Sequence, residues 1–315
     1  MATKQSSTSP SFFNFLKEGV LLPTRNRKLF AGIFVTVAAS TLLLLLGYNL
    51  AVQPLTNKLN LDTKALNSTH PGSPDLVHLI QEIQDDTRQI MLVGAAFALF
   101  AVIIGSIFRI IILFAAVATY SGELHTFGTL LGKAKAQLKG PLVTLAFVYV
   151  LELAYFAFLA ALVALRAFLV FKHYFGLFFV EYLVLLLACI FFVYFFFLCS
   201  LSVVVAVAEP GCHGASALVR AWRLMQVKKR RAMLFIFVTG VLGAVLSPVQ
   251  TLAQTCVMSN LALGLLLESL YSILIAAVGL FASCAMTAFY YECKGSTDAS
   301  ATEYVKMSTQ EPVSA

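Results

Sequence analysis

The chain alternates six long apolar stretches with shorter polar segments. The apolar stretches cover residues of about 29–52, 90–121, 141–165, 174–207, 232–253 and 264–291. An α-helix needs about 20 apolar residues to cross the hydrocarbon core of a bilayer, and each stretch is long enough. The pattern therefore predicts an all-α, polytopic membrane protein with six transmembrane helices.

The longest polar segment between two apolar stretches is residues 53–89, which we expect to form a loop outside the membrane. Near its middle, Ser73, Pro74 and Asp75 form a typical helix start. Leucine and isoleucine side chains follow at helical spacing. We therefore expect a helix that begins here and continues into the second apolar stretch.

Composition excludes the soluble classes of protein. Of the 315 residues, 60% are hydrophobic and only 12% are charged, whereas soluble domains carry about 25% charged residues. The net charge of +7 comes from basic residues beside the apolar stretches. This placement favours an anionic membrane surface over nucleic acid as the partner of the basic residues.

The distribution of lysine and arginine predicts the orientation. With the N-terminus in the cytosol, 16 of these residues fall on the cytosolic side and 5 on the other side. Cytosolic loops of membrane proteins are enriched in Lys and Arg, so both termini are predicted to be cytosolic. The expected organisation is a cytosolic segment over residues 1–28 with an amphipathic helix, a membrane domain over 29–291, and a disordered cytosolic tail over 292–315.

One glycosylation acceptor sequence agrees with this orientation. It is Asn67-Ser68-Thr69, the single match to Asn-x-Ser/Thr in the chain, and it falls in the outer loop. Cys212 and Cys293 fall beside predicted membrane ends, where S-acylation is chemically feasible; unmodified cysteines are the alternative.

A short amphipathic stretch with basic residues precedes each odd-numbered span. The apolar faces are Phe12, Phe13, Leu16 and Val20 in the first; Leu124, Phe127, Leu131, Ala134 and Leu138 in the second; Ala215, Leu218, Trp222 and Met225 in the third. Such stretches suit helices that lie in the headgroup plane, so we expect three interfacial helices on the cytosolic face. The alternative is that they are basic flanks without a lipid role.

The third stretch is the most basic, and it supplies the candidate contacts to anionic headgroups. These are Arg220, Arg223, Lys228, Lys229, Arg230 and Arg231. Each cation near an anionic leaflet contributes about 1 kcal/mol of attraction.

Two charged residues fall deep within predicted spans. Arg109 lies in the second span and Glu152 in the third, at matching distances from the cytosolic ends of these spans. Intramembrane charges are costly and commonly pair with one another. We therefore predict an ion pair between Arg109 and Glu152; a solute or proton pathway is the alternative.

The segment from Glu209 through Arg230 resembles an element of the glycerophosphoryl diester phosphodiesterase membrane-domain-like proteins. The matching residues are Glu209, Gly214, Ala217, Leu218, Ala221, Trp222, Leu224 and Arg230. The run Tyr290-Tyr291-Glu292-Cys293-Lys294 is similar to the exit of the last span in that group, and PTRNRKLFAGIFV resembles the start of a plant branch of uncharacterised six-helix transmembrane proteins. The resemblance implies a six-helix membrane fold without established chemistry.

Motifs for catalysis or cofactor binding do not occur in the sequence: it contains no P-loop, GxGxxG, GxSxG or HExxH. We therefore expect no enzyme activity, cofactor or bound metal. The expected function is a non-enzymatic membrane protein that organises lipid or partners in the endomembrane system or plasma membrane. A transporter or channel for a small solute is the alternative.

Overall fold

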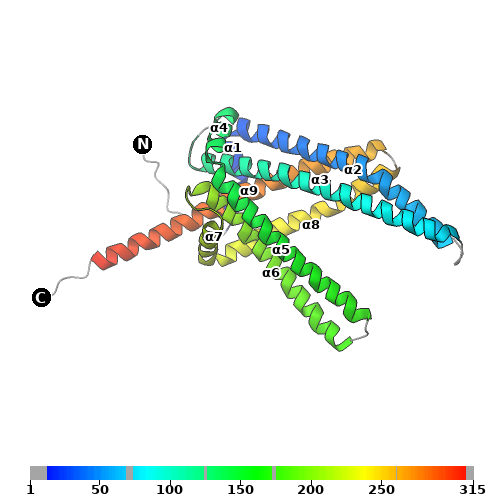
Figure 1. The fold of residues 1–315 in the computed structure, drawn as a ribbon. Coiled ribbons are helices and arrows are strands. Elements are labelled where there is room, and N and C mark those ends of the chain that lie inside the picture. Colours follow the sequence, from blue (N-terminus) through cyan, green and yellow to red (C-terminus); the bar gives the residue numbers. More distant parts are fainter. Residues whose placement is uncertain (1–12, 69–73, 124–125, 172–174, 260, 310–315) are drawn as a thin grey trace. The chain divides into compact units, whose positions relative to one another are not determined.

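The computed structural model describes residues 13–68, 74–123, 126–171, 175–259 and 261–309, and these residues form nine α-helices and no strand (Figure 1). The helices are α1 (Asn14–Arg25), α2 (Arg27–Ser68), α3 (Pro74–Tyr120), α4 (Phe127–Gln137), α5 (Lys139–Phe171), α6 (Phe175–Ala208), α7 (Ala215–Val227), α8 (Lys229–Ser259) and α9 (Leu261–Thr309). Six of them, α2, α3, α5, α6, α8 and α9, are long and apolar enough to span a membrane. The all-α, multi-pass character predicted from the sequence is confirmed.

The order of one short helix followed by two long ones occurs three times in the described residues. A single residue separates the short helix from the next long one in each case: Asn26, Leu138 or Lys228. Asn26 (φ −134°, ψ 67°) and Lys228 (φ −131°, ψ 49°) leave the helical region in nearly the same way, whereas Leu138 stays helical. The short helices coincide with the three predicted amphipathic stretches, while their position in a headgroup plane stays a prediction.

Two long helices extend beyond the predicted spans. α2 continues past Val52 to Ser68 and α9 continues past Tyr291 to Thr309, where the sequence predicted a loop and a disordered tail. Both predictions rested on polarity, but polarity does not end a helix. Few helix-breaking residues occur in these segments; α2 accommodates Pro54. The predicted helix beginning at Pro74 is present as the start of α3.

The chain divides into two compact units. The second unit consists of Gly32–Arg109 and Val245–Ala277, which are parts of α2, α3, α8 and α9. Within it, α2 and α3 run antiparallel: the rings of Tyr48 and Phe97 meet at 6.2 Å, and Lys58 lies 3.0 Å from both Glu82 and Asp86. These ion pairs join the polar ends of the two helices.

Polar contacts also attach α9 to α2 in this second unit. The Ser272 hydroxyl donates to the carbonyl oxygen of Ala38 at 3.1 Å, and the Asn49 amide donates to the Glu268 carboxyl group. Glu268 is only 3% exposed. A buried carboxyl group in an apolar bundle needs such a donor because desolvation is costly.

The first unit consists of Met1–Ala31, Ile110–Ala244 and Val278–Ala315, with α1, α4, α5, α6 and α7 entirely inside it. Its core contains an aromatic cluster in which Phe15 of α1 contacts Phe235 and Phe289, and Phe197 contacts the same two rings. The close approach of α1 to α9 requires Gly19, because a Cβ there would lie 2.6 Å from the Cβ of Ala285.

The long helices of the first unit present apolar side chains outward. Val150 and Leu153 of α5 and Phe179 of α6 are 66%, 71% and 74% exposed. Between the two helices, Tyr155 donates to the carbonyl oxygen of Ala188 at 2.9 Å. Large apolar residues exposed in this number are costly in water and suit a lipid environment.

Candidate functional site

Residues 290–294 of α9, in the first unit, form the centre of a polar network that we call the α9 hub. Its polar members Tyr290, Tyr291, Glu292 and Lys294 follow the apolar part of the helix, and Cys293 between them is fully buried. On a helix, four successive residues point in four directions about the axis. The hub therefore reaches several neighbouring elements at once.

Glu292 joins α1 and the start of α8 to the hub. Its carboxylate forms an ion pair with Arg231 and accepts a hydrogen bond from Asn14 at 3.4 Å. Lys228, the joint between α7 and α8, donates to the backbone carbonyl oxygen of Glu292 at 3.0 Å. The side chains of Glu292, Arg231 and Lys228 are 12%, 13% and 18% exposed. Little water reaches these charges, so each is stabilised mainly by the opposite charge beside it.

Glu209 joins the loop between α6 and α7 to the same hub. Its carboxylate accepts a hydrogen bond from the Tyr290 hydroxyl at 2.8 Å and lies 3.4 Å from Arg220 Nε and 3.3 Å from Lys294 Nζ. Burial by itself would raise the pKa of the Glu209 carboxyl group. The Tyr290 hydrogen bond and the two cations outweigh burial and hold this pKa below its usual value. Glu209 therefore stays ionised to a lower pH than an ordinary glutamate.

Tyr291 joins the end of α3 to the hub. Its ring stacks on that of Tyr120 with centroids 4.3 Å apart and an interplanar angle of 6°, and its hydroxyl lies 3.4 Å from the Ser121 hydroxyl. Residues of the first and third short–long–long repeats, together with the loop that follows α6, thus contact one region of α9. The arrangement is a structural junction of paired charges.

The predicted headgroup contacts fall into two groups. Arg220, Lys228 and Arg231 face the hub and form ion pairs with Glu209 or Glu292. The other three are exposed and form no ion pair with any described residue: Arg223, Lys229 and Arg230. The sequence does not distinguish the two groups, because all six lie in one basic segment.

α7 packs on the bundle with one face, and most of the face that the sequence assigned to the headgroup plane is not buried. Its buried residues are Ala217, Ala221, Leu224 and Met225. Of the predicted face, only Met225 is buried, while Trp222 is 42% exposed next to the ring of Tyr194. Small alanines allow close contact with the bundle, while Ala215, Leu218 and Trp222 of the predicted face are not buried.

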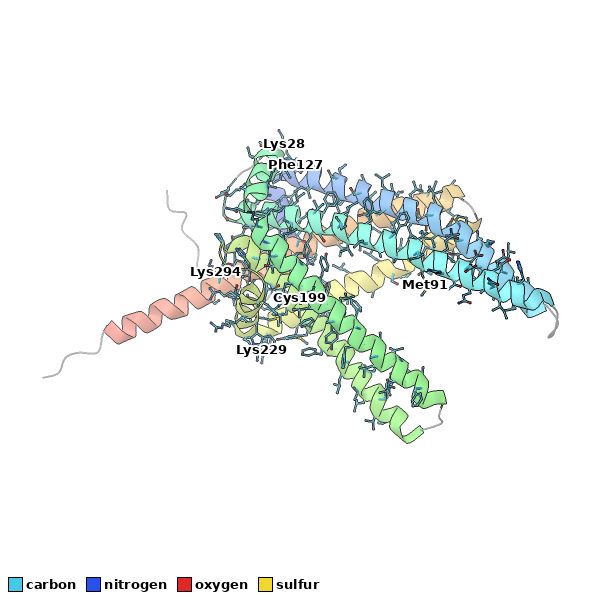
Figure 2. All side chains as sticks on the ribbon, in the orientation of Figure 1. Lys28, Met91, Phe127, Cys199, Lys229 and Lys294 are labelled. Carbon is cyan, nitrogen blue, oxygen red and sulfur yellow. The ribbon has the colours of Figure 1, made fainter. Side chains whose placement is uncertain are left out.

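The exposed side of each short helix also carries apolar residues. These are Phe13 and Val20 on α1, Phe127 and Leu131 on α4, and Val219 and Trp222 on α7. Figure 2 labels Phe127 and Lys229, which are both exposed in the first unit. The three helices therefore contact the bundle with one face and present a second apolar face outward.

Three further sequence predictions concern an intramembrane ion pair, a glycosylation acceptor and two cysteines. Glu152 is 8% exposed in the first unit, and Arg109 is the last α3 residue of the second unit. Their ion pair stays a prediction, for which a double-mutant cycle is the appropriate measurement.

Asn67 lies in the last turn of α2, while Thr69 of its acceptor sequence lies outside the described residues. Cys293 is fully buried, which disfavours its acylation in the folded protein, and Cys212 is partly buried.

Sequence reasoning named Glu209 and the run from Tyr290 to Lys294 mainly through a resemblance, and it did not predict the contacts between them. The pairing of Glu209 with Tyr290 spans 81 positions and that of Glu292 with Asn14 spans 278. No local pattern connects residues this far apart. The available signal was the concentration of polar residues immediately after an apolar span.

Comparison with known proteins places nearly the whole chain in one family. Residues 5–304 match the family described as "Domain of unknown function (DUF8558)". No curated protein matches the chain, and no solved structure matches it. The chain belongs to the DUF8558 family.

Proposed function

We propose that this member of the DUF8558 family is a non-enzymatic membrane protein that binds anionic lipid headgroups through its short helices, and that it thereby organises lipids or partner proteins in an endomembrane or the plasma membrane. The observation that carries the proposal is the exposure of Trp222 and Arg223 on α7 and of Lys229 and Arg230 at the start of α8. None of these three cations forms an ion pair with a described residue of the α9 hub.

The exposed face of α7 has the chemistry of a membrane interface. Trp222 and Arg223 follow Val219 by three and four residues, so the three side chains lie on one side of the helix. Trp is favoured at the headgroup level because its ring is apolar and its N–H is polar. Lys229 and Arg230 begin α8 and add two further charges.

The other two short helices support the same proposal. α1 and α4 are attached to the bundle by buried residues such as Phe15 and Leu130, yet they expose Phe13 and Phe127. An apolar face that remains outward after folding can enter the boundary between headgroups and acyl chains. Three such helices would anchor one side of the first unit in the leaflet.

We expect the triple variant R223Q/K229Q/R230Q to lose most of its preference for anionic lipid. At about 1 kcal/mol per cation, the ratio of bound phosphatidylserine to bound phosphatidylcholine should fall about tenfold or more. Spin-labelled lipids with the full-length protein in bilayers would measure this ratio. The thermal midpoint should not change, because none of the three side chains has an ionic partner among the described residues.

The matched control is K64Q/R88Q/R166Q, which removes the same charge from the side predicted to face away from the cytosol. This control should leave the lipid ratio unchanged. An equal fall in both variants would show that only total charge matters, and an unchanged ratio in both would refute the proposal.

We also propose that both termini are cytosolic. An even number of spans puts the two ends on one side, and six candidate spans agree with this. The excess of lysine and arginine on the proposed inner side supports the direction.

The α2–α3 hairpin provides the test of orientation. The helical extension of α2 would place Asn67 about 22 Å beyond Val52, at 1.5 Å per residue. We expect the wild-type protein, expressed in a glycosylating cell, to lose mass on treatment with an endoglycosidase, and Asn67→Gln to show no such loss. Protease cleavage of a tag at only one terminus in sealed vesicles would contradict the six-span arrangement.

A further inference from the structure

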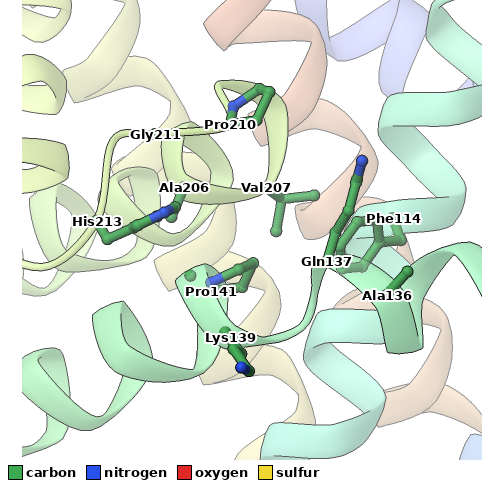
Figure 3. Close-up of a pocket in the computed structure, with 11 residues that line it drawn as sticks. Phe114, Ala136, Gln137, Lys139, Pro141, Ala206, Val207, Pro210, Gly211 and His213 are labelled. Carbon is green, nitrogen blue, oxygen red and sulfur yellow. The ribbon is translucent and has the colours of Figure 1, made fainter.

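A small cavity lies in the first unit where the end of α4, the start of α5 and the loop between α6 and α7 meet (Figure 3). Its volume is about 210 Å³. Pockets for drug-sized ligands occupy roughly 300–1,000 Å³, so this cavity suits a single small chemical group.

The polar side chains that line the cavity are those of Lys139, His213 and Gln137, and all three residues are exposed. Among the described residues, no Asp or Glu lines the cavity. A lysine has three N–H donors, and a neutral histidine has one. Glu209, the carboxylate within this loop, is already held by Tyr290, Arg220 and Lys294. The cavity is therefore suited to an anion.

Hydrogen bonds hold the two walls of the cavity together. The Thr144 hydroxyl donates to the carbonyl oxygen of Gly140 at 3.1 Å and accepts from the backbone N–H of Gly214 at 2.8 Å, and both contacts are buried. The backbone of His213 is fixed by Ser216, whose hydroxyl lies 3.0 Å from its N–H and 2.8 Å from its carbonyl oxygen. The loop that carries His213 is thus attached to the first turn of α5.

Gly140 allows the imidazole to occupy its position. A Cβ at this residue would collide with the ring atoms of His213. Gly211 and Gly214, on either side of His213, have φ values of +106° and +58°, which other residues rarely adopt. Three glycines therefore place this ring at the cavity, and a preformed site loses less entropy on binding.

We propose that this cavity binds a phosphate group, with Lys139 as its cationic partner and His213 and Gln137 as hydrogen-bond donors. Phe114, Pro141 and Val207 form the apolar part of the wall, which suits a phosphate that is attached to an apolar molecule. The group can come from a lipid headgroup or from a soluble phosphate. The lipid source rests on the proposed function, whereas the soluble source does not.

Calorimetry on the full-length protein in detergent tests the soluble source with inorganic phosphate. Binding from nanodiscs that contain phosphatidic acid, compared with phosphatidylcholine alone, tests the lipid source. We expect K139Q to weaken binding at least about tenfold and K139Q/H213Q to abolish it, because charge-assisted hydrogen bonds are the strong ones. The control is K135Q, since Lys135 is exposed on α4 and does not line the cavity.

Gly140→Ala provides a second test that keeps every charge. It should displace the His213 ring and weaken binding, with the thermal midpoint measured in parallel to establish folding. Binding of phosphatidic acid without binding of inorganic phosphate would identify a lipid site, and the reverse would identify a soluble ligand.

The proposal is overturned if neither probe binds, or if K139Q/H213Q binds as well as K135Q. The surface variant R223Q/K229Q/R230Q should retain phosphate binding in the cavity. Loss of anionic-lipid preference in that variant and loss of phosphate binding in K139Q/H213Q are separate results, so either proposal can fail alone.

Discussion

We expect Glu292→Gln to lower the free energy of unfolding by about 3 kcal/mol, because it removes one partner from a largely buried set of charges. Arg231 and Lys228 are 13% and 18% exposed and would keep their charges without the carboxylate. Glutamine preserves the shape and can still accept one hydrogen bond. Chemical or thermal unfolding in detergent measures the loss.

The control for this variant is Glu123→Gln. Glu123 pairs with Lys133 at 2.6 Å, but the two side chains are 48% and 42% exposed. An exposed ion pair contributes at most about 1 kcal/mol. A double-mutant cycle of Glu292→Gln with Arg231→Gln should show strong coupling. If Glu292→Gln costs no more than Glu123→Gln, the hub does not stabilise the first unit.

The second large effect is expected from Gly19→Leu, which should separate α1 from α9. A Cβ at Gly19 would lie 2.8 Å from the Cα of Ala285, so a larger side chain requires the backbones to move apart. Phe15 and Leu22, both 0% exposed on the same face of α1, would then lose their contacts. Full exposure of two such side chains costs about 1.5–3 kcal/mol each.

Limited trypsin digestion measures this separation, since α1 contains Lys17 and Arg25 as cleavage sites. Cleavage at these residues should become several-fold faster in Gly19→Leu. The control is Gly32→Leu, because no atom lies within 4 Å of a Cβ built at Gly32. Equal digestion of Gly19→Leu and Gly32→Leu would mean that α1 does not depend on this contact.

The sequence by itself determines the class of the protein and the order of its helices. Apolar stretches of membrane-spanning length predicted six spans, and six long apolar helices are present. The amphipathic stretches predicted short helices before the first, third and fifth spans, where α1, α4 and α7 lie. The prediction of long apolar helices is confirmed because helix length and hydrophobicity are local properties of the chain, while the interfacial role of the short helices stays a prediction.

Only the tertiary structure decides where helices end in polar segments and which face of a helix is buried. The polar extension of α2 is paired with α3 through Lys58, which no local pattern reveals. α7 buries Ala217 and Ala221 against the bundle, and the hydrophobic spacing, which marked the face around Trp222 as the membrane-facing one, did not show which residues pack on the protein.

The division of the basic segment is also a tertiary property. Arg231 and Arg223 have the same charge and lie eight residues apart, yet Arg231 pairs with Glu292 and Arg223 is exposed. A lysine or arginine forms an ion pair only when folding brings a carboxylate close to it, and Glu292 lies 61 residues from Arg231 in the chain. The sequence thus shows how much positive charge the segment carries. The fold decides which of these charges remain exposed, because burial and pairing depend on residues that are distant in the chain.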